Sequence, residues 1–238
     1  MNAQSGRRGG IIFQGDVTSA LLLFLIFLLF GSVAIASASD DAAVVTVVSG
    51  KAISRRPGQE GTRHLKRGDA VLAADTVETG SDARLQLRLA DGAVINILPA
   101  SSLRISQYAF TKNTMRRSAV INLLQGSARF FVQQPDKQLR SKISQLERTE
   151  GSRFVIETSQ AQIDSWEADV VIETDPEKST VYTLGGGVTV RNRSNLVVGT
   201  TRVGENLSVI VVSKKAPTIP SIIPQEQRRI FVRDARLF

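Results

Sequence analysis

Residues 84–98 alternate apolar and polar side chains around one tight turn, and this pattern constrains the fold more than any other feature. Leu85, Leu87 and Leu89 alternate with polar or charged residues. A period of two places one face of a strand in a core and the other in water. Asp91-Gly92 then predicts a tight turn, because Gly adopts positive φ without steric cost and Asp can bond nearby backbone amides. The stretch therefore predicts a β-hairpin.

Similar patterns recur along most of the chain. Short runs rich in Val, Ile and Leu lie between Gly, Asp and Pro turn signals, which is typical of compact all-β folds. We expect about fifteen short strands, arranged as a solenoid-like stack or a compact β roll. The expected strands include an opening pair at 44–48 and 51–54, then 83–89, 93–98, 103–105, 118–124, 128–133, 154–158, 168–173, 180–184, 187–191 and 206–212.

One segment departs from the β pattern and predicts a short helical insertion. In residues 136–150, Leu139, Ile143 and Leu146 are spaced four and three apart, as on one face of a helix. Its apolar stripe is expected to pack on the β domain, because a helix of this length is marginal without tertiary support. Its basic residues leave contact with a membrane surface as the alternative.

The glycine triplet at residues 185–187 superficially resembles a phosphate-binding loop. It lacks the Lys-Ser/Thr ending and the following helix that such a loop requires. We therefore expect a turn or a bulge there.

The N-terminal segment has the order of a secretory signal. Arg7 and Arg8 precede an apolar run at 20–36, and small residues follow at 36–39. We expect cleavage after Ala38, with retention as a single-pass anchor as the alternative. The expected parts are a signal peptide or anchor at 1–38, a β domain at 39–213, and a Pro-containing linker with a basic tail at 214–238.

Composition limits the chemistry that the chain can support. It has no Cys and one His, so thiolate sites are excluded and neither a metal nor a cofactor is expected. His64 lies in a charged stretch and is expected to be a solvated loop residue. The net charge of +8 predicts attraction to anionic surfaces. The export signal and the 5% aromatic content argue against nucleic acid as the partner.

A longer set of turn residues follows a recognisable pattern and comprises Gly68, Asp69, Asp75, Thr76, Thr79, Gly80, Asp91 and Gly92. With the strands around them, these residues resemble the FecR-like domain of bacterial envelope proteins. The resemblance covers roughly residues 44–212 and is strongest before residue 132. It implies an exported all-β domain in which these residues form the family-pattern turns.

The chain departs from the family pattern in one region. Where the family carries TP.A.IGVRGT.F, residues 158–170 read TSQAQIDSWEADV. Trp166 lies in this acidic stretch, and Trp is enriched at binding hot spots. We take Trp166, together with Arg84 and Arg88 on the water-facing side of the hairpin, as candidate interaction residues. A packing role is the alternative for Trp166.

The leading functional interpretation is a non-enzymatic, exported FecR-like module, located in the periplasm or cell envelope, that binds an envelope protein or an anionic envelope polymer. Membrane-surface contact and self-association are further options. The alternative is a single-pass, inner-membrane sensor or regulator of FecR type without a recognisable cytoplasmic anti-sigma arm. An enzyme would need a carboxylate pair or a Ser-Lys dyad. The candidate pair, Asp164 and Asp169, has the character of solvated loop acids. No catalytic residues are expected.

Overall fold

The computed structural model describes residues 41–114, 116–133 and 152–235, all within one compact unit, Ser39–Phe238. The expected helix at 136–150 and the expected signal at 1–38 lie outside the described residues. The domain boundaries therefore stay predictions.

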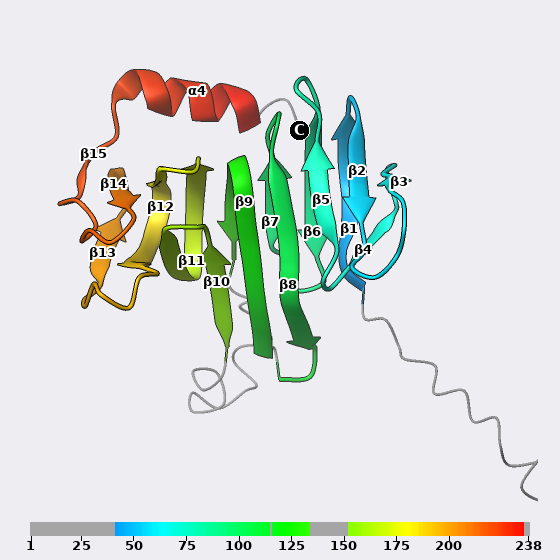
Figure 1. Ribbon diagram of the computed structural model, residues 1–238, viewed down its shortest axis with the longest axis horizontal. Helices are drawn as coiled ribbons and strands as arrows, with labels where there is room; N and C mark the ends of the chain where they lie inside the picture. The colour runs from blue at the N-terminus through cyan, green and yellow to red at the C-terminus, as the bar shows by residue number, and fades with distance from the viewer. Residues whose placement is uncertain (1–40, 115, 134–151, 236–238) are drawn as a thin grey trace, which may run out of the picture. The chain divides into compact units, whose positions relative to one another are not determined.

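The prediction of an all-β domain made of many strands is confirmed (Figure 1). Fifteen strands and one helix form the described part. They are β1 (Asp41–Ser49), β2 (Ala52–Arg55), β3 (Arg63–His64), β4 (Ala70–Leu72), β5 (Thr76–Thr79), β6 (Arg84–Leu89), β7 (Val94–Ile97), β8 (Ser102–Thr111), β9 (Arg116–Val132), β10 (Arg153–Glu157), β11 (Ala161–Thr174), β12 (Lys178–Asn192), β13 (Thr201–Gly204), β14 (Leu207–Val212), β15 (Ser221–Ile222) and α4 (Gln225–Ala235).

One continuous sheet supplies both layers of the domain, because three long strands belong to both. The first half of β9 pairs with β8 and β10, and its second half pairs with β7 and β11. In the same way β11 and β12 change partners along their length. The first layer contains β4, β1, β6, β7, β14 and β15, and the second contains β3, β2, β5, β8, β10 and β13.

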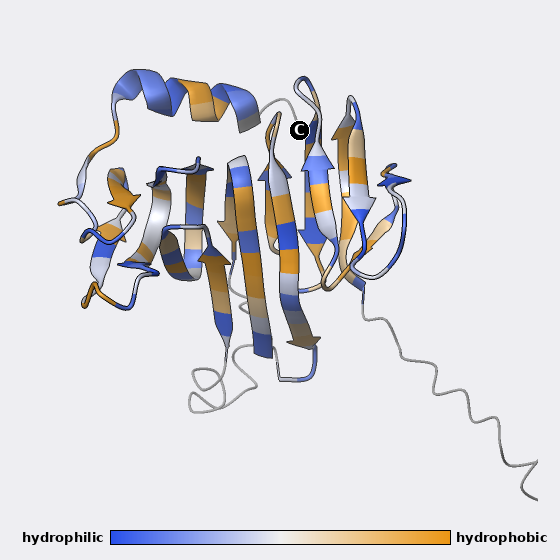
Figure 2. Cartoon of the chain, in the orientation of Figure 1, coloured by the Kyte–Doolittle hydropathy of each residue, from blue (hydrophilic) through white to orange (hydrophobic). Residues whose placement is uncertain are grey.

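The space between the layers holds a single apolar core. Strand β6 buries Leu85, Leu87 and Leu89 and turns its other side chains outward, as the period of two predicts. Figure 2 shows this alternation along the strands. The largest fully buried side chains come from both layers and include Phe130, Phe154, Ile95, Ile97, Leu103, Ile105, Ile121 and Ile156.

Glycines lie where β9 and β12 change layer, whereas β11 contains no glycine and shifts register opposite the glycines of β12. Gly126 has φ +87°, and a Cβ there would lie 2.7 Å from Ser101 Cα and 2.8 Å from Ala100 O. Gly186 has φ +71°, and a Cβ there would collide with Glu167 O. The register between β11 and β12 shifts beside Gly185 and Gly186, which confirms the expected turn or bulge.

Two details of the expected strand pattern are wrong. The segments 118–124 and 128–133 form one bent strand, as do 180–184 and 187–191, because the backbone ladder continues through each glycine bend. The opening strands do not pair with each other. Strand β1 pairs with β4 and β6 whereas β2 pairs with β3 and β5, because the chain turns at Gly50 (φ +75°) and enters the other layer.

A buried ion pair ties the hairpin turn to β9. Arg117 Nη1 lies 3.0 Å from Asp91 Oδ2, and the two side chains are only 4% and 0% exposed. The same nitrogen donates to Gln133 O at 3.0 Å, and the guanidinium lies 5.3 Å from the centre of the Phe154 ring. The Asp91 amide donates to Tyr108 Oη at 2.8 Å. Burial, followed by the Asp91 charge, raises the pKa of Tyr108 well above its usual range.

Replacing Gly126 with Ala tests the layer change against a matched control. Gly92 has nearly the same φ, +88°, but open space where a Cβ would lie. Gly92→Ala should cost about 1–2 kcal/mol of unfolding free energy from the left-handed backbone alone. Gly126→Ala adds backbone collisions and should cost about 2–4 kcal/mol. Urea unfolding measures both, and equal losses would contradict a steric requirement at Gly126.

Removing the Asp91 carboxylate tests the buried ion pair. Asp91→Ala should lower the free energy of unfolding by about 3–5 kcal/mol, because it removes a buried carboxylate that lies 3.0 Å from the buried Arg117 guanidinium. Glu78→Ala is the control, since Glu78 and Arg55 form a pair with side chains 34% and 55% exposed. That change should cost less than about 1 kcal/mol. Thermal unfolding compares the two variants. Similar losses of stability would show that the buried pair contributes no more to stability than the exposed pair.

Candidate interaction surface

The outer face of the first layer carries a row of side chains that remains open to solvent. The strand registers place Val44, Arg88, Val94 and Phe131 side by side on four neighbouring strands. Val44 is 40% and Phe131 41% exposed, Arg88 is exposed, and Val94 is half-buried. We call these four residues the open row. It presents apolar area around one cation, a composition found in the buried centres of protein interfaces.

The neighbouring row on the same face is polar and held in place by its own hydrogen bonds. Thr46 Oγ1 donates to Gln86 Oε1 at 2.7 Å, and Gln86 Nε2 donates to Asn96 Oδ1 at 3.0 Å. Arg129 continues the row and binds both carboxylate oxygens of Asp169, at 2.7 and 2.5 Å. These contacts fix the side chains that border the open row.

Helix α4 packs on this face and runs across the strands (Figure 1). Phe231 is its anchor: the side chain is 3% exposed, and its ring centre lies 4.9 Å from that of Tyr182 on β12. Arg129 Nη1 donates to Phe231 O at 3.3 Å. Part of the segment 214–238, which we expected to be a linker with a basic tail, is therefore a helix packed on the sheet.

The two ends of α4 make polar contacts with β11 and β6. Gln227 Nε2 donates to Glu173 Oε1 at 3.5 Å, and Asp234 lies 3.7 Å from Arg84. The structure thus separates two of the residues predicted for interaction. Arg84 is engaged by the helix, whereas Arg88, four residues along the same strand, stays in the open row.

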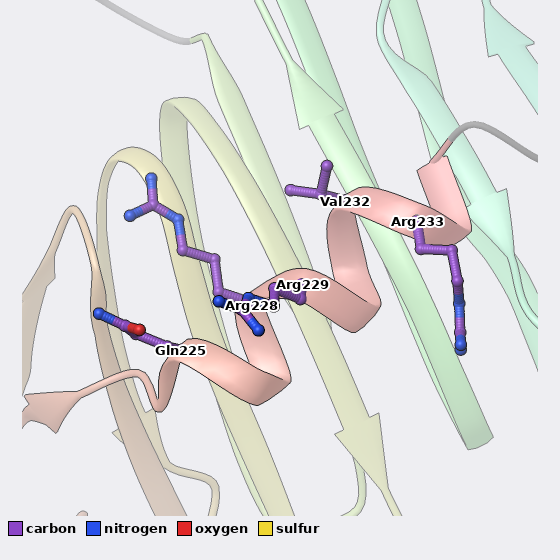
Figure 3. A pocket seen from close by; sticks show the side chains of 5 residues that line it. All are labelled: Gln225, Arg228, Arg229, Val232 and Arg233. Atoms are coloured by element: carbon purple, nitrogen blue, oxygen red, sulfur yellow. The ribbon is translucent and has the colours of Figure 1, made fainter.

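The opposite face of α4 is basic. Gln225, Arg228, Arg229, Val232 and Arg233 are exposed and recur at helical spacing, so they share one side of the helix (Figure 3). They line a hollow of about 500 Å³. Three guanidinium groups around an exposed valine favour an anionic contact surface.

A carboxylate beneath the helix has an altered protonation equilibrium. Glu173 accepts from Tyr182 Oη at 3.2 Å as well as from Gln227. Burial is the main cause that raises the pKa of Glu173 above its usual value. Burial, followed by the charge of Glu173, raises the pKa of Tyr182 to about 12. The ionised form of Glu173 therefore destabilises the folded protein relative to the protonated form.

The residues of the family-pattern turns have structural roles. Asp75 accepts from Arg56 and from the Leu72 amide, and Asp69 accepts from the Lys66 amide. Thr79 Oγ1 bonds the backbone at 98 and 101. Thr76 is the first residue of β5 and pairs with Arg55 of β2. The Gly80 amide donates to Lys51 O, and Gly68 and Gly92 have positive φ. These residues hold turns and strand ends.

The region that replaces the family's GVRGT motif is part of β11. Trp166 is in this strand, but its side chain lies outside what the structure describes. Asp164 and Asp169 are also on β11 rather than in a loop, which corrects the expectation from sequence. Asp164 lies 3.6 Å from Arg153 Nε, and Asp169 binds Arg129. Each acid therefore has a partner from a neighbouring strand.

His64 is exposed, as expected, but lies in the two-residue strand β3 rather than in a loop. Within residues 41–114, 116–133 and 152–235, no three His, Cys, Asp or Glu side chains are grouped to hold a metal. Over the same residues, no helix combines the length and the apolar character needed to cross a membrane.

The turns, strands and rows described above fall largely within one family match. Residues 75–189 match the family model described as FecR protein. The chain contains a FecR domain. This match includes Asp75, the Asp91-Gly92 turn and the three long strands through residue 189, so the FecR domain supplies most of the open row and all three strands shared between layers.

Solved structures give a more distant likeness. Two crystal structures of a candidate anti-sigma factor from Parabacteroides distasonis ATCC 8503, at 2.50 and 1.65 Å resolution, are each 18% identical to this chain. The TM-scores are 0.48 and 0.47, and each match covers 66% of this chain. It covers 63% and 64% of the other chains, so this chain matches less than two thirds of their length. No curated protein sequence matches.

The protonation of Glu173 gives a pH-dependent prediction. Its raised pKa means that the folded protein binds this proton more tightly than the unfolded chain does, so Glu173 disfavours folding as pH rises through its folded pKa. Glu173→Gln should therefore raise Tm at pH 7 and leave it nearly unchanged at pH 3. Thermal scans at both pH values measure the difference. A variant less stable than the parent at pH 7 would show that the charge is favourable there.

Proposed function

We propose that this FecR-domain protein is a non-enzymatic, exported binding module of the cell envelope, and that it recognises an anionic envelope protein or polymer through the open row and the outer face of α4. The observation that carries the proposal is the open row itself. Four side chains on four strands are aligned, partly apolar and uncovered, beside residues that are fixed by hydrogen bonds.

Charge supports an anionic partner. Arg88 lies within the open row, and Arg228, Arg229 and Arg233 are exposed on α4. The whole chain carries a net charge of +8, the same sign as the local arginines. Both the overall charge and the local contacts therefore favour an anionic partner. Apolar area from Val44 and Phe131 can then hold a partner after the charges have oriented it.

Site-specific photo-crosslinking in the producing cells tests this proposal. A photoreactive residue in place of Phe131 should give a discrete adduct with an envelope component. The same residue in place of Glu205, an exposed position in the β13–β14 turn, is the control and should not. Adding Arg88→Glu to the variant with the photoreactive residue at position 131 should reduce the yield of adduct about tenfold. The change reverses the charge in the middle of the open row.

Two results would count against the proposal. One is the absence of an adduct at position 131 in cells that contain the folded protein. The other is an adduct whose yield is the same with and without Arg88→Glu. Binding at the open row would then not depend on the charge of Arg88, contrary to the proposal.

The FecR match also supports a FecR-type regulator that stays in the membrane through residues 1–38 and signals through a partner. The intact mass and N-terminal sequence of protein from fractionated cells distinguish the two forms. A chain that begins at Ser39 in the soluble envelope fraction supports the exported module. The full-length chain in the membrane fraction supports the anchored regulator.

A further inference from the structure

A polar cavity lies where the rolled sheet ends, between the edge strands β3 and β4. Its volume is about 550 Å³, within the range of small-molecule sites. The edges are linked by Arg63, whose Nη2 donates to Ala70 O at 2.6 Å. The lining residues come from β1, β2, β3, β4 and the loop after β2, and include Asp41, Ser54, Arg56, Gln59, Glu60 and Thr62.

The guanidinium group of Arg56 forms one wall of the cavity and is held in place by Asp75. Arg56 Nε and Nη2 donate to the two oxygens of Asp75, at 2.9 and 3.3 Å, and the Asp75 side chain is 1% exposed. Asp75 is itself held by the Leu72 amide at 3.1 Å. The hydrogen bond to Asp75 is the main cause that raises the pKa of Arg56, so the donor stays charged. Nη1 takes no part in the pair.

A mostly buried serine lines the same cavity. Ser54 is 5% exposed and, within the described residues, its Oγ makes no hydrogen bond. The Oγ atom is not among the fully enclosed polar atoms that lack a partner, so the hydroxyl is accessible from the cavity. A ligand hydroxyl can therefore form a hydrogen bond with it in place of water.

The remaining lining groups mix donors and acceptors. Asp41 and Glu60 are exposed carboxylates that form no ion pair within the described part of the chain, and Gln59 and Thr62 add groups that both donate and accept. An anionic ligand would meet two uncompensated carboxylates. An organic cation would meet the Arg56 guanidinium and would find no aromatic ring in the lining.

We propose that this cavity binds a neutral saccharide. A sugar hydroxyl donates to a carboxylate and accepts from a guanidinium or amide, so adjacent hydroxyls satisfy the interleaved groups without burying a net charge. The site is separate from the open row and does not depend on the function proposed for it.

Ser54→Ala is the sharpest variant for this proposal. Ser54 Oγ has no partner among the described residues, so the change removes no internal hydrogen bond there and should leave Tm unchanged. Two neutral trisaccharides, maltotriose and triacetylchitotriose, are titrated into the protein isolated from its producing cells, and backbone amide shifts are followed by NMR. At least one should bind with saturation below about 20 mM and shift amides in 54–63 and 70–75. Ser54→Ala should weaken that binding about tenfold.

Glu60→Ala, an exposed change in the cavity wall, should weaken saccharide binding as well, whereas Glu205→Ala, an exposed acid outside the cavity lining, should not. Failure of both trisaccharides to shift any cavity amide would overturn the proposal. So would equal binding by Ser54→Ala and the parent, since the hydroxyl would then have no ligand.

Discussion

The fold depends on three strands that serve both layers. Strands β9, β11 and β12 each begin in one layer and end in the other, so neither layer can form its full set of backbone hydrogen bonds without the other. The bends of β9 and β12 need glycine because the chain at Gly126 and Gly186 has positive φ and approaches other backbone atoms closely. At Gly126 even one methyl group would meet Ser101 and Ala100.

A buried ion pair gives a second constraint on β9, at its ends rather than at its bend. The Asp91–Arg117 pair joins the hairpin turn of the first layer to the start of β9, and Arg117 also binds the residue that follows the end of that strand. A buried pair of this kind is weak evidence for added stability, but it does favour one arrangement over others because a misplaced charge is costly. The two ends of β9 are thereby held together.

Both proposed sites follow from how a rolled sheet ends and what covers it. Helix α4 packs by Phe231 on the outer face and leaves the open row uncovered, which turns one row of ordinary strand side chains into a candidate interface. At the other site the edges of β3 and β4 do not pair with each other, and the polar side chains between them line a cavity. The FecR match at residues 75–189 includes three of the four residues of the open row, whereas the cavity lining precedes it except for Asp75.

The sequence alone determined the β class, because the period of two in residues 84–98 and the Asp91-Gly92 turn are local signals. It also indicated the bulge at the glycine triplet. Tertiary structure decided which strands are continuous and which segments pair, since a glycine bend and a strand end look alike in sequence. It also decided that Arg84 binds α4 while Arg88 stays exposed, and that Ser54 and Arg56 face one cavity. Those outcomes depend on contacts between distant residues, which no local pattern encodes.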